Sequence, residues 1–144
     1  MTRGIDTAET DVTLRFSPQW VDGLRAHWQS LMSAAVWGDL ETAQLGAASR
    51  LRRRLLELGE RIRSLVAPRD WIPHRRERVK SALAAALAVR ETLSLTEAAL
   101  TVLKPGPCAE QLKTVFGDLS GLLVDELQKR EMVWARLLDS QIED

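Results

Sequence analysis

Apolar residues recur along most of the chain at the alternating steps of three and four that place them on one face of a helix. In residues 40–66 these positions are Ala48, Leu51, Leu55, Leu58, Ile62 and Leu65. In residues 74–103 they are Val79, Ala82, Ala86, Val89, Leu93, Thr96, Leu100 and Leu103. A similar stripe in residues 108–140 contains Leu112, Phe116, Leu119, Leu123 and Leu127. The pattern therefore predicts three long helices, over 40–66, 74–103 and 108–140.

A shorter helix is predicted before them, over residues 18–37. The pair Ser17-Pro18 suits a helix start, because serine caps free amides and proline is tolerated at the first helical position. The pair Gly38-Asp39 then interrupts a run of good helix formers. Glycine can adopt the left-handed conformation that ends a helix, and aspartate can cap the next one. We therefore expect a tight reversal at residue 38.

Two further breaks contain proline, within residues 67–73 and 104–107. Links this short make successive helices antiparallel. The predicted fold class is all-α, an antiparallel up-down-up-down four-helix bundle over residues 17–144 with a shorter first helix. Residues 1–16 are expected to be a flexible or extended N-terminal segment.

The charge is balanced overall but unevenly placed. The 144 residues include 20 basic and 20 acidic side chains, while residues 50–80 contain eleven basic and four acidic ones. This basic block either attracts the acidic segments within a bundle or forms an anion-binding surface. The arginines expected to gather at one end of the bundle for the second role are Arg61, Arg63, Arg69, Arg75, Arg76 and Arg78. Nucleic acid is disfavoured as a partner because the net charge is zero.

Residues that could perform catalysis or bind a metal are scarce. The chain has two histidines and one cysteine, Cys108, and no metal-binding, phosphate-loop or nucleophile-elbow motif. We therefore expect a non-enzymatic protein with no cofactor and no metal. No apolar run approaches the ~20 residues that span a bilayer, and a single cysteine suits a reducing compartment. These features predict a cytoplasmic location without membrane insertion.

Broad apolar faces without catalytic groups favour protein binding, through an amphipathic helix of the partner. The expected partner-binding residues, on the last helix, are Leu123, Leu127, Val133, Trp134, Leu137 and Leu138. The same residues could form a homodimer seam. Five tryptophans and no tyrosine are present. Tryptophan serves both as core residue and as exposed anchor at interfaces, and the sequence leaves both roles open.

The stretch His27–Ile62, HWQSLMSAAVWGDLETAQLGAASRLRRRLLELGERI, resembles the first helical hairpin of flagellar type III export chaperones of the FliT/FlgN kind. The likeness lies in Gly38-Asp39-Leu40-Glu41 and in Arg54-Leu55-Leu56-Glu57-Leu58. It implies a small cytosolic helical bundle that masks an aggregation-prone helix of an exported subunit. The alternative is a regulator that binds nucleic acid or another polyanion through the arginine-rich end of the second and third helices.

Overall fold

The computed structural model describes residues 13–140, and within this range all regular structure is helical. The helices are α2 (Pro18–Met32), α3 (Val36–Ala43), α4 (Leu45–Val66), α5 (Arg75–Thr101) and α6 (Pro107–Asp139). This confirms the all-α prediction. The described residues form five helices where the sequence predicted four, because the expected first hairpin contains the additional short helix α3.

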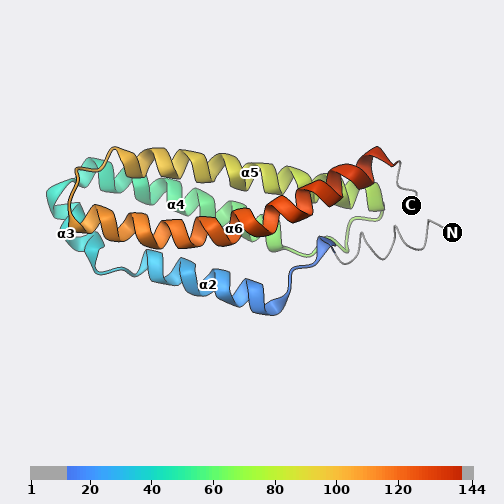
Figure 1. Cartoon of the computed structure of the whole chain (residues 1–144), viewed down its shortest axis with the longest axis horizontal. Helices are drawn as coiled ribbons and strands as arrows, with labels where there is room; N and C mark the ends of the chain where they lie inside the picture. The colour runs from blue at the N-terminus through green and yellow to red at the C-terminus, as the bar shows by residue number, and fades with distance from the viewer. Residues whose placement is uncertain (1–12, 141–144) are drawn as a thin grey trace.

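The four longer helices extend along the long axis of the molecule, and α3 lies across one end (Figure 1). α4 packs on α5, α5 packs on α6, and α2 packs mainly on α6. The short α3 contacts both α4 and α6. α2 is about half as long as α6, with 15 residues against 33. One flank of the longer helices is therefore covered by the shortest of the four.

The prediction of a helix break at Gly38 is wrong. Gly38 and Asp39 lie inside α3, and the backbone of Gly38 is not in the left-handed region. The first helix instead ends at Met32, and a second corner follows at Gln44, whose φ of −144° and ψ of 59° are not helical. The connection is therefore made of two corners separated by two helical turns.

Trp37 explains why the first corner lies before α3 and not at Gly38. Its side chain is only 4% exposed, and its indole Nε1 donates a hydrogen bond of 2.8 Å to the carbonyl of Leu31. The last carbonyls of a helix have no partner within that helix, so Trp37 satisfies one of them at the end of α2. Arg52 of α4 lies 5.1 Å from the Trp37 ring centroid and forms an ion pair with Glu41. These contacts hold α3 against α2 and α4.

A Gly38→Ala substitution tests the position of this corner. Within a helix, alanine is more favourable than glycine by about 0.5–1 kcal/mol, and a Cβ at residue 38 would meet no heavy atom within 4 Å. We therefore expect the variant to gain unfolding free energy of that order, measured by urea denaturation. A left-handed helix end at Gly38 would give a loss instead.

The three long helices bury the stripes that the sequence predicts. All six predicted seam positions of α4 are buried, as are the eight predicted in residues 74–103. In α6 the five predicted positions are buried together with Ala109, Trp134 and Leu137. Apart from the polar Thr96, these side chains form one hydrophobic core, and their burial supplies the main stabilising term of the fold.

The predicted N-terminal segment, residues 1–16, falls mostly on residues 1–12, which lie outside the described residues, as do residues 141–144. Residues 13 and 14 are helical and residues 15–17 are not. Ser17 caps α2 as predicted, because its Oγ accepts a hydrogen bond of 3.1 Å from the amide of Trp20. The described helices end close to their predicted ends near residues 66, 103 and 140.

Candidate functional site

A groove separates α2 from α4 on the flank that α2 covers. Its volume is about 300 Å³, at the lower end of the range of ligand pockets. The apolar side chains that line it are Val21, Leu24, Trp28, Leu56, Ile62 and Val66. Arg25, Glu60 and Arg63 form its charged part. We call this feature the α2–α4 groove.

The groove follows from how the two helices meet. Trp28 of α2 leans over Gly59 of α4, and a Cβ on Gly59 would lie 2.8 Å from the Trp28 ring. The absence of a side chain at residue 59 lets the indole approach the α4 backbone. One residue position away from the buried Leu55, Leu56 is 58% exposed. A large apolar side chain is therefore held at the edge of a concave apolar surface.

The outer surface of α4 carries arginines in two different states. Arg52 pairs with Glu41, Arg54 pairs with Glu57 at 3.1 Å, and Arg63 pairs with Glu60 at 3.1 Å. Three more are exposed and form no ion pair with a carboxylate among residues 13–140: Arg50, Arg53 and Arg61. On its outer surface α4 therefore presents positive charge that the described residues do not neutralise.

The predicted partner-binding residues of α6 lie in the core. Leu123, Leu127 and Trp134 are 0% exposed and Leu137 is 2% exposed. The other two, Val133 and Leu138, are partly buried and packed against the core. The whole set therefore presents no open apolar face. A partner or a second copy of the chain could reach the four buried side chains only if α6 left its packed position.

The structure does not gather the six predicted anion-binding arginines into one site. Arg63 lines the α2–α4 groove, and Arg61 is exposed on α4. Arg76 donates a hydrogen bond of 2.9 Å to the carbonyl of Leu138 near the end of α6. The side chain of Arg75 is partly buried near the start of α5.

The remaining two predicted arginines, Arg69 and Arg78, line a second hollow. Arg69 hydrogen-bonds backbone carbonyls at the end of α4. Arg78 donates a hydrogen bond of 2.5 Å to the carbonyl of Ile72. Polyanion binding by the six together therefore stays a prediction, and the arrangement favours separate local roles for most of them.

The structure resolves the two roles that the sequence left open for tryptophan. Trp37 and Trp134 are buried, and Trp20 and Trp28 are partly buried against the core. Trp71, in the link between α4 and α5, is 79% exposed. Four of the five therefore pack on the core, and only Trp71 stands out from the surface.

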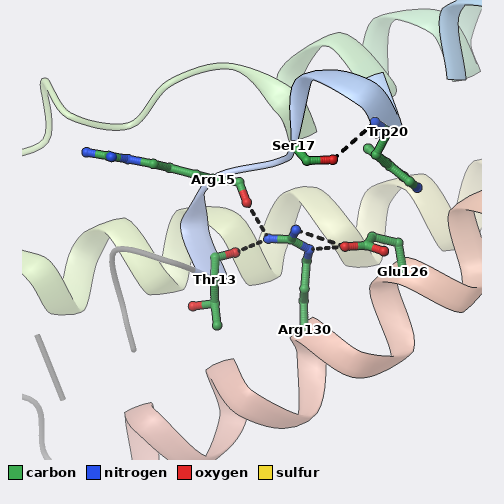
Figure 2. Close-up of polar contacts among 6 residues, drawn as sticks. All are labelled: Thr13, Arg15, Ser17, Trp20, Glu126 and Arg130. Carbon is green, nitrogen blue, oxygen red and sulfur yellow. Dashed lines mark hydrogen bonds and ion pairs between the residues drawn. The ribbon is translucent and has the colours of Figure 1, made fainter. Parts of the chain in front are cut away.

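Arg130 of α6 forms a hub that the sequence did not predict (Figure 2). Its guanidinium bonds to Glu126 Oε1 at 2.9 Å and 2.8 Å, donates to the carbonyl of Arg15 at 2.7 Å, and also donates to the carbonyl of Thr13. It stacks over the Phe16 ring at 4.0 Å. Glu126 is a recognisable (i, i+4) partner, but no local pattern links residue 130 to residues 13–16.

Groups suited to metal chemistry do not converge in the described range. No cluster of three or more histidine, cysteine, aspartate or glutamate side chains that could bind a metal ion occurs in residues 13–140. Cys108 is a free, half-buried thiol. None of the helices in the same range combines the length and the apolar character needed to cross a membrane.

Comparisons with protein families, with curated proteins and with solved structures give no match to this chain.

Proposed function

We propose that the protein is a non-enzymatic protein-binding module that holds one amphipathic helix of a partner protein along the α2–α4 groove. The observation that carries the proposal is Leu56, a large apolar residue left 58% exposed at the edge of an apolar hollow. Helix-in-groove recognition uses such hollows for the apolar side chains of the bound helix. The volume of about 300 Å³ suits anchor side chains rather than a whole helix.

The charge on the outer surface of α4 favours one kind of partner helix. Arg50, Arg53 and Arg61 are exposed on α4 without a carboxylate partner in the described part of the chain. A partner helix that also extends over this surface, with acidic residues flanking its apolar face, would place carboxylates near these cations. Such complementarity mainly raises the association rate and selects the partner. The proposed partner is therefore an acidic amphipathic helix.

A more specific form of the proposal rests on the resemblance of residues 27–62 to the FliT/FlgN export chaperones. In this form the protein is cytosolic and the bound helix belongs to an exported or flagellar subunit. The long helices then act as one up-down-up-down unit that presents the groove. Shielding an exposed apolar helix from aggregation requires an apolar surface such as the one around Leu56.

A Leu56→Glu substitution should abolish capture of the partner helix with little effect on folding. The carboxylate would place a charge in the apolar groove and repel an acidic helix, so we expect at least about tenfold weaker binding. Leu56 is mostly exposed, and substitutions at such positions usually change unfolding free energy by no more than about 0.5 kcal/mol. The matched control is Leu87→Glu, because Leu87 is 56% exposed on α5.

The partner segment can be identified with a photo-crosslinking amino acid at residue 56, and at residue 87 for comparison, in the native host. Mass spectrometry of the crosslinked peptide identifies the segment. A synthetic copy should bind the purified protein, become helical on binding by circular dichroism, and bind Leu56→Glu at least tenfold more weakly. The proposal fails if the segment has no apolar helical face, if it comes from a second copy of this chain, or if Leu56→Glu binds it normally.

A further inference from the structure

A second hollow, of about 740 Å³, lies between the segment that precedes α2 and the link that follows α4. Residues 14–18 form one wall, residues 66–70 form another, and Arg78 and Arg130 contribute from α5 and α6. Four of its lining side chains are arginines, and Asp70 is the single acidic one. We call this feature the cationic cleft.

Arg69 brings a buried positive charge to the cleft. It is 7% exposed, and burial lowers the pKa of its guanidinium by removing water from the charged form. Its hydrogen-bond acceptors are all neutral. They are Ser81 Oγ at 3.1 Å and the carbonyls of Ser64, Leu65 and Ala67 at 3.0, 2.9 and 3.0 Å. In the described part of the chain no carboxylate forms an ion pair with it.

Arg78 and Arg15 supply donors that are still available. Arg78 uses only Nη1, toward the carbonyls of Ile72 and Pro73. The side chain of Arg15 is exposed and forms no hydrogen bond or ion pair within residues 13–140. Figure 2 shows it extending away from Arg130. A guanidinium carries five N–H donors in a fork that matches carboxylate and phosphate oxygens, so both side chains can still receive an anion.

The charge of the cleft differs from that of the paired arginines on α5 and α6. Arg90 pairs with Glu131 at 2.6 Å, and Arg130, which also lines the cleft, pairs with Glu126. By contrast, Arg15, Arg69 and Arg78 have no carboxylate within ion-pair distance among the described residues. Asp70 alone cannot balance three cations. An anion from outside the chain would supply the missing negative charge.

The cleft also has apolar walls, formed by Leu14, Phe16, Val66 and Pro68. Its volume falls within the range of about 300–1,000 Å³ that is typical of small-molecule sites. We propose that the cationic cleft binds a small organic anion, a carboxylate or a phosphate monoester on an apolar body. Arg15 and Arg78 contact the anionic group, Arg69 adds a buried positive charge, and the apolar walls contact the body of the ligand.

The test is a titration of the full-length, ¹⁵N-labelled protein at low salt, followed by NMR. The probes are octyl phosphate, octanoate, octanol and inorganic phosphate. We expect the first two to saturate, with shift changes centred on residues 14–18, 66–70 and 78. Octanol and inorganic phosphate should require at least about tenfold higher concentration for half-saturation. Octanol lacks the anionic group that the arginines contact, and inorganic phosphate lacks the apolar chain that the walls contact. Whichever of the first two binds more tightly identifies the preferred anionic group.

Arg15→Glu is the decisive variant, because the side chain has no structural partner to lose. Octyl phosphate and octanoate should bind it at least about tenfold more weakly. Arg53→Glu is the matched control, with the same charge change on an exposed arginine of α4, and should bind them within twofold of the wild type. Equal thermal midpoints for the two variants would establish that folding is unchanged.

Three results would overturn the proposal. The first is equal binding of octanol and octyl phosphate, and the second is equal binding of inorganic phosphate and octyl phosphate. The third is equal affinity of Arg15→Glu and Arg53→Glu for both organic anions. None of these bears on the α2–α4 groove, so the two proposals stand or fall separately.

Discussion

Trp134→Ala is expected to lower the free energy of unfolding by about 3–5 kcal/mol, the usual cost of truncating a fully buried tryptophan. Trp134 is 0% exposed and is among the largest fully buried side chains. Its helix, α6, packs on α2, α3 and α5, so a cavity beside α6 weakens the contacts that hold the molecule together. Because small domains are stable by only about 5–15 kcal/mol, the variant should be close to unfolding.

The measurement is urea denaturation followed by circular dichroism. Met132→Ala, two residues away and 76% exposed in the wild type, should change the unfolding free energy by no more than about 0.5 kcal/mol. Trp134→Phe should cost less than Trp134→Ala, because phenylalanine leaves a smaller cavity. The buried indole Nε1 has no hydrogen-bond partner in the described structure, so phenylalanine leaves no acceptor unpaired. Similar losses for Trp134→Ala and Met132→Ala would contradict the packing described for α6.

The sequence predicted the buried stripes because helical periodicity is a local property. A residue such as Leu58 is placed on the core face by its spacing from Leu55 and Ile62, whatever the helix packs against. The sequence placed the helix break at Gly38 because it shows local preferences only, and in the structure a tertiary contact outweighs them. Glycine and aspartate favour a helix end there, but burial of Trp37 moved the corner to residues 33–35.

The candidate sites were harder to predict because their parts come from distant segments. The cationic cleft joins Arg15 to Arg78, and the hub joins Arg130 to residue 13, and no spacing rule connects positions so far apart. One local signal for the groove was present. Leu56 is apolar but lies beside the buried Leu55 rather than on the seam, and such an off-seam residue predicts exposed apolar surface.

Arg69→Met is expected to lower the free energy of unfolding by about 2–4 kcal/mol, from the loss of hydrogen bonds to a charged donor and the exposure of buried acceptors. Methionine replaces the apolar stem of arginine, but it leaves three backbone carbonyls at the end of α4 without their donor. It also removes the bond to Ser81 Oγ, which joins the link to α5. The free energy of unfolding of Arg69→Lys should lie between those of the wild type and Arg69→Met, because a compact ammonium cannot reproduce the planar fork of the guanidinium.

The pH dependence of the Arg69→Met effect follows from the direction of the pKa shift. Burial lowers the pKa of Arg69 in the folded protein, so the folded state loses this proton at a lower pH than the unfolded state does. The free energy of unfolding therefore rises with pH only around the folded pKa, at strongly alkaline pH. Between about pH 6 and pH 9 arginine is charged in both states, and the difference between wild type and Arg69→Met should stay constant. The control is Arg61→Met, at an exposed position of α4, for which we expect a change within about 0.5 kcal/mol. Equal effects of the two substitutions would mean that Arg69 does not hold the end of α4. That result would contradict the arrangement described for residues 66–70, which form one wall of the cationic cleft.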